Sequence, residues 1–118
     1  MAAALRNQAD GLCCLEAAAE LLIAQTWLDR DDFTSGFITT APGLTDARPM
    51  AAVDWTAVIS ALDSGQLPCS GGEQRMLRLA ASLAEGIPVD LREALTGIDR
   101  LNADLLTAAI RRASGHRR

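Results

Sequence analysis

The chain has 118 residues and a formal net charge of −4, and 49% of its residues are hydrophobic. This length and composition suffice for a single helical domain over residues 1–118 with a modest core. The acidic balance argues against a protein that coats nucleic acids, because phosphate binding requires a basic surface. Alanine and leucine dominate the apolar residues and β-branched runs are scarce. The composition therefore predicts an all-α fold, a compact bundle of about five to six short helices.

Both ends of the chain, residues 1–9 and 115–118, are predicted to be frayed. No apolar run approaches membrane-spanning length. The first ten residues, MAAALRNQAD, do not combine a charged start with a long apolar segment, so no signal peptide is predicted. We therefore expect a cytoplasmic protein that does not bind membranes.

The first predicted helix runs from Asp10, its expected N-cap, to about Leu28. Its apolar residues recur at helical spacing, which is typical of a helix that faces a core. The pattern also covers two heptads, so it fits a seam for self-association. The residues expected to form this possible interaction surface are Leu12, Leu15, Leu22 and Trp27.

The segment after this helix contains three aspartates, of which Asp31 or Asp32 can begin a short helix. Phe33 and Phe37 lie four residues apart and would share the inner face of that helix. The aspartates do not match the calcium-loop pattern D-x-[DN]-x-[DN]-G-x5-E, so no metal site is predicted here.

Residues 39–52 are predicted to form the longest loop of the chain. Pro42 and Gly43 are a turn signal, and Pro49 disfavours a helix around it. A loop of this length in a compact domain is often either functional or merely mobile, and it is the expected place for divergence in an interaction surface.

Helix starts are clearly marked in the second half of the chain. Ser70 is followed by Glu73 at the spacing of a capping box, and the predicted helix extends over residues 71–85. Other helices are predicted to begin with an aspartate cap and to end at a glycine. These three helices begin after Asp54, Asp90 and Asp99 and end near Gly65, Gly97 and Gly115.

The stretch SGGEQRMLRLAASLA, which begins at Ser70, resembles the LSGGQ signature loop of ATP-binding-cassette ATPases. Those enzymes also need a G-x-x-x-x-G-K-[ST] phosphate loop and an apolar strand that ends in aspartate. This chain has no lysine, and the predicted helix is followed by GIPVDLREALTG. The stretch is therefore interpreted as an ordinary capped helix that carries no catalytic residue.

The last predicted helix is expected to bury Leu101, Leu105 and Ala109 along one side. Charge is unevenly distributed: residues 1–59 carry three arginines against eight acidic residues, and residues 60–118 carry eight against seven. Arginines in a last helical turn suit the negative end of the helix dipole, but they also fit contact with nucleic acid. The candidate residues for that contact are Arg111, Arg112, Arg117 and Arg118.

Three cysteines, Cys13, Cys14 and Cys69, do not have the C-x-x-C spacing of a metal site, and His116 is the one histidine. We expect them to be small buried hydrophobes, and a bridge to Cys69 or a shared metal stays open. No catalytic residue, cofactor site or metal site is predicted.

Three stretches resemble a family of small uncharacterised proteins from actinobacteria. They are ELLIAQTWLDRDDF from Glu20 to Phe33, the helix start at Trp55 and Thr56, and the segment from Leu67 to Asn102. The resemblance implies a bacterial cytoplasmic source. It implies no activity and contributes no functional residues.

These observations predict a non-enzymatic helical protein that acts through protein–protein contacts, as a homodimer or an adaptor. Excess apolar helix surface, beyond what 118 residues can bury, would drive the association. A DNA-binding regulator that uses the arginine-rich C-terminal half is the alternative. An enzyme or a nucleotide-linked accessory protein is the second alternative, although the sequence offers no nucleophile–base pair for it.

Overall fold

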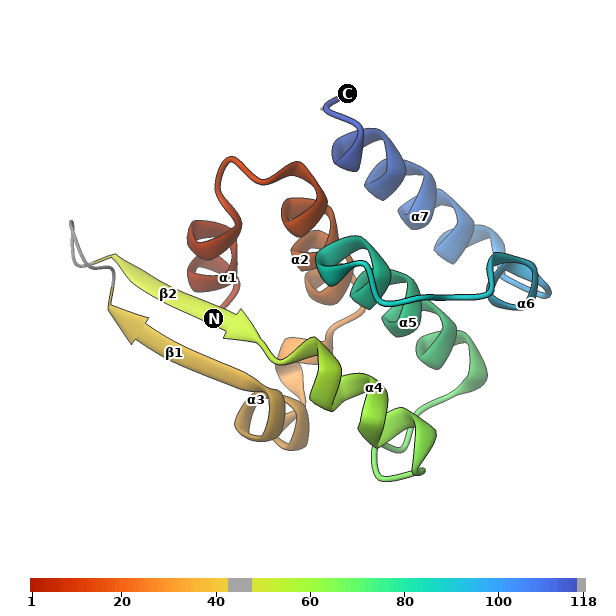
Figure 1. Cartoon of the computed structure of the whole chain (residues 1–118), viewed down its shortest axis with the longest axis horizontal. Coiled ribbons are helices and arrows are strands. Elements are labelled where there is room, and N and C mark those ends of the chain that lie inside the picture. The colour runs from red at the N-terminus through yellow and green to blue at the C-terminus, as the bar shows by residue number, and fades with distance from the viewer. Residues whose placement is uncertain (43–47, 117–118) are drawn as a thin grey trace.

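The computed structural model describes residues 1–42 and 48–116 (Figure 1). These residues form seven α-helices, one short 3-10 helix and a two-stranded antiparallel sheet. The elements of the first half are α1 (Ala2–Ala9), α2 (Cys13–Ala24), η1 (Trp27–Asp29), α3 (Asp31–Phe37), β1 (Ile38–Pro42) and β2 (Pro49–Val53). Those of the second half are α4 (Trp55–Asp63), α5 (Gly71–Glu85), α6 (Leu91–Leu95) and α7 (Arg100–Ala113).

Helix α2 lies at the centre of the fold. It packs against α5 on one side and α7 on another, and α1 also contacts it. Figure 1 shows the β1–β2 hairpin and α6 at opposite ends of the molecule, with α7 running back from α6 toward the C-terminus. Because α7 contacts the fold chiefly through α2 and α5, the rest of its surface faces outward.

The predicted helix starts of the second half are confirmed. The Ser70 hydroxyl accepts a hydrogen bond from the backbone N–H of Glu73, and the Glu73 carboxylate accepts one from the N–H of Ser70. The carboxylates of Asp54, Asp90 and Asp99 each accept a backbone N–H three residues later. Each cap therefore pairs an amide that the helix itself leaves without a partner.

The N-terminal residues differ from the frayed turn that we predicted for residues 1–9. They form α1, which buries Ala4, Leu5 and Ala9 against the hairpin and α2. The predicted cap at Asp10 is also wrong, because α2 begins at Cys13. Packing against neighbours, which local sequence does not reveal, stabilises this short alanine-rich helix.

The prediction of a purely helical fold is wrong in one region. Much of the expected loop over residues 39–52 is the β1–β2 hairpin, in which Ile38 pairs with Val53 and Pro42 with Pro49. The side-chain amide of Asn7 donates to the carbonyl of Pro49, and Ala51 is buried. Contact with α1 thus stabilises a pairing that two prolines argued against. Gly43, expected in the turn, lies outside the described residues.

The core is built from the inner sides of α2, α4 and α5 together with aromatic side chains. Trp27, Phe33 and Phe37 contact one another in a row with tilted rings, whose centroids are 5.1 Å and 5.5 Å apart. The guanidinium of Arg30 covers the outer face of Trp27 and donates to the carbonyl of Pro68. Among the described helices, none has the length and apolarity needed to span a membrane.

Candidate functional site

The apolar stripe of α2 belongs mainly to the core, so two of the four residues predicted to form an interaction surface there are buried. Leu22 and Trp27 are each only 1% exposed. Leu15 is half-buried, and Leu12, at 57%, is exposed just before the helix begins. The sequence pattern did not distinguish a central helix from an associating one, because both need the same apolar spacing.

Large exposed apolar side chains gather instead on α6 and α7. Leu91 and Leu95 are 58% and 42% exposed, Leu101 is 69% exposed and Ile110 is 55% exposed. These account for four of the six large exposed hydrophobic residues in the described part of the chain. Isolated surface leucines are ordinary, whereas several within one short segment are typical of a contact surface.

The shortness of α6 explains why its leucines are exposed. The helix has five residues, and its one buried side chain is Ala94, which lies on the side that contacts α5. Leu91 and Leu95 flank Ala94 four residues apart, so they share another side of the helix. A helix of little more than one turn has one side against α5, so Ala94 is buried there and Leu91 and Leu95 remain exposed to solvent.

One part-buried hydrogen bond and two buried apolar residues fix the orientation of α7. The side-chain amide of Gln25 donates to Oδ1 of Asn102 over 2.6 Å, which joins α2 to the first turn of α7. Asn102 also lies beside Gly72 at the start of α5. Leu106 and Ala109 complete the inward side. Leu101 therefore points outward, in contrast to the prediction that it faces the core.

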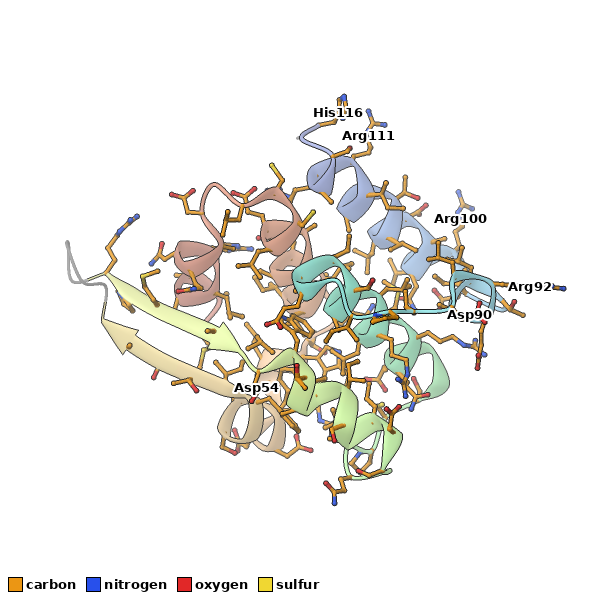
Figure 2. The ribbon with its side chains drawn as sticks, in the orientation of Figure 1. Asp54, Asp90, Arg92, Arg100, Arg111 and His116 are labelled. Carbon is orange, nitrogen blue, oxygen red and sulfur yellow. The ribbon has the colours of Figure 1, made fainter. Side chains whose placement is uncertain are left out.

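Charged side chains without partners accompany these leucines. In the described residues Arg92, Arg100 and Asp104 are exposed and make no ion pair or side-chain hydrogen bond. Figure 2 shows Arg92 and Arg100 pointing away from the body of the molecule at the α6 end. We call the group formed by these three charges and the three leucines the α6–α7 surface. It comprises Leu91, Arg92, Leu95, Arg100, Leu101 and Asp104.

Arg111 and Arg112, predicted to contact nucleic acid, lie at the other end of α7. They line a groove of about 300 Å³ between α2 and α7, whose floor is mostly alanine and leucine. Nη1 of Arg112 is 3.9 Å from Oε1 of Glu16, so this arginine faces a carboxylate. The other two predicted residues, Arg117 and Arg118, lie outside the described residues.

The mouth of this groove carries an ion pair between α1 and α2. Arg6 donates from Nε and Nη2 to the two carboxylate oxygens of Glu20, over 2.8 Å and 3.0 Å. These hydrogen bonds lower the pKa of Glu20 and outweigh the opposing effect of its partial burial. Acidic and basic groups thus alternate around the groove, which is a poor match for the uniform negative charge of a nucleic acid backbone.

The arrangement of α6 and α7 also differs from a DNA-reading pair of helices. A helix-turn-helix places basic and amide side chains on the exposed side of its second helix. On α7 that side carries Leu101 and Asp104 beside Arg100, while the amide Asn102 is bonded to Gln25.

Neither the three cysteines nor the start of α5 at Ser70 forms a ligand site in the described residues. Cys13 and Cys69 are half-buried and Cys14 is exposed, and all three are free thiols. In the described residues no three acidic, cysteine or histidine side chains are grouped so that they could bind a metal ion. Ser70 acts as a helix cap.

No protein-family model, curated protein or solved structure matches this chain. Sequence reasoning missed the α6–α7 surface, although one signal for it was present. A five-residue helix with two leucines around a single alanine has more apolar surface than one contact can cover.

Proposed function

We propose that this protein is a small interaction module that binds another protein chain through the α6–α7 surface. The observation that carries the proposal is the 69% exposure of Leu101, together with two further exposed leucines on α6, the helix that precedes α7 in the chain. Leaving a leucine in water forgoes about 1.5–3 kcal/mol relative to burying it fully. A partner that covers these side chains would recover part of that free energy.

The mixed charges of the α6–α7 surface support a protein partner over other ligands. Arg92, Arg100 and Asp104 are exposed on the same two helices as the leucines and carry both signs of charge. An apolar centre with a polar rim is the usual composition of protein interfaces. The fixed position of Asn102 on Gln25 holds Leu101 ready for contact, so little ordering would be needed on binding.

The test is site-specific photo-crosslinking in cells that express the full chain. A photoreactive phenylalanine derivative replaces Leu101 in one variant and Ile110 in a matched control. Ile110 is similarly exposed at 55%, but nine residues further along α7 it points to the opposite side of the helix. Protein adducts from position 101 and few from position 110 would support the proposal. Equal yields at both positions, or none at 101, would refute it.

A further inference from the structure

We propose that the partner of the α6–α7 surface is a second copy of this chain. In the inferred dimer the first turns of the two α7 helices cross in antiparallel directions, about a two-fold axis that passes the outer side of α7 beside Leu101, at the level of residue 102. This inference rests on the proposed function and names the partner. It moves self-association from α2, whose leucines are largely buried, to the outer side of α7.

A two-fold axis at this place would bring opposite charges of the two copies together, because Arg100 and Asp104 lie on either side of it. Arg100 and Asp104 are four residues apart in α7, and neither has an ion-pair partner among the described residues. When two helices run antiparallel about an axis at residue 102, position 100 of one copy faces position 104 of the other. Each Arg100 then meets the Asp104 of the second copy, and both pairs form at once.

The apolar residues fit the same placement. Leu101 lies next to the axis, so each copy covers the most exposed leucine of the other. Leu91 and Leu95 lie on α6, just before α7 in the chain, and are the other exposed leucines of the α6–α7 surface. Arg111 and His116 lie at the far end of α7, outside this contact (Figure 2). The charged pair and the exposed leucines thus both place the dimer contact at the N-terminal end of α7.

Outside the α6–α7 surface, the exposed apolar residues that the structure describes have different surroundings. Leu12 is exposed, but it stands alone before α2. Ile110 is near Arg111, which already takes part in an interaction. At the groove between α2 and α7 the carboxylate of Glu20 is bonded to Arg6. Among the described residues, the α6–α7 surface is where exposed leucines and unpartnered charges of both signs occur together.

Sedimentation equilibrium of the full chain tests the dimer through a charge exchange. Arg100→Asp places two carboxylates opposite each other across the axis, and Asp104→Arg places two guanidinium groups there. Each single variant should weaken dimerisation about tenfold, since two weak surface pairs are lost and become repulsive. The double variant Arg100→Asp/Asp104→Arg restores opposite charges and should return dimerisation to near the wild-type value.

Leu101→Glu and Ile110→Glu serve as a matched pair of apolar substitutions in the same experiment. Leu101→Glu should abolish the dimer, whereas Ile110→Glu should leave it intact, and circular dichroism verifies that every variant is folded. A double charge variant weaker than both single variants would overturn the proposed pairing. A wild-type chain that stays monomeric at about 100 µM would overturn the dimer itself.

Photo-crosslinking at position 101 separates this inference from the proposed function. Adducts with a different protein, together with a monomeric wild-type chain, would refute the dimer and leave the interaction module supported. Adducts of twice the mass of the chain would support both. The absence of any adduct at position 101 would refute both.

Discussion

Truncating Leu22 and Leu101 to alanine tests the burial that underlies the functional argument. The two substitutions remove the same atoms from helical positions, but Leu22 is 1% exposed and Leu101 is 69% exposed. Leu22 lies in α2 at the centre of the core, and Leu101 lies on the outer side of α7. Because the two substitutions remove the same atoms, a difference between their effects on the free energy of unfolding reflects how deeply each leucine is buried.

The expected costs differ several-fold. Leu22→Ala leaves a cavity among close-packed neighbours and should lower the free energy of unfolding by about 2–5 kcal/mol. Leu101→Ala removes a side chain with less than a third of its surface buried, so its cost should be roughly 0.5–1 kcal/mol. Alanine also has the higher helix propensity, which offsets part of that smaller loss.

Urea denaturation followed by circular dichroism gives both values. The protein should be at about 1 µM, where association contributes little to apparent stability. Raising the concentration to about 100 µM should stabilise the wild-type chain but not Leu101→Ala if Leu101 lies in an interface. Equal costs for the two substitutions, or a cost below about 1 kcal/mol for Leu22→Ala, would refute the assignment of α2 to the core.

Three further outcomes are expected. Ser70→Ala removes a helix cap and should destabilise the fold by about 1 kcal/mol in the same assay. The hydrogen bonds from Arg6 hold the pKa of Glu20 below its ordinary value of 4.5, so this pair stabilises the fold above that pH and is lost as the pH falls further. The stability difference between wild type and Arg6→Gln should therefore be larger at about pH 7 than at about pH 3. Burial, with a smaller effect of a nearby carboxylate, raises the pKa of the Cys69 thiol, so iodoacetamide should label exposed Cys14 first in a mass-spectrometric time course.

Local chemistry made the helix starts of the second half predictable. Ser70, Asp54, Asp90 and Asp99 satisfy backbone amides within three residues, and no other part of the fold is needed for that contact. The helices from α4 to α7 were predictable for this reason. The prediction of α2 depended on its apolar spacing instead, and its start at Cys13 was missed because no side chain caps it.

Elements that depend on distant partners were not predictable from local sequence. Helix α1 and the β1–β2 hairpin pack against each other, and the bond from Asn7 to Pro49 joins positions 42 residues apart. Each was predicted to be irregular because neither has strong local signals. Each segment buries its apolar side chains against the other, and this contact cannot be inferred from the sequence of either segment alone.

The same limit explains why the candidate surface was first assigned to α2 and not to α7. Both helices have apolar residues over a wide arc, so apolar periodicity alone does not show which of them lies in the core. The number of neighbours decides between them. Helix α2 contacts α1, α5 and α7 and buries its stripe, whereas α7 contacts chiefly α2 and α5. A helix covered on one side can bury Leu106 and Ala109 but not Leu101 as well, so surplus apolar area in a peripheral helix is where an interface should be sought.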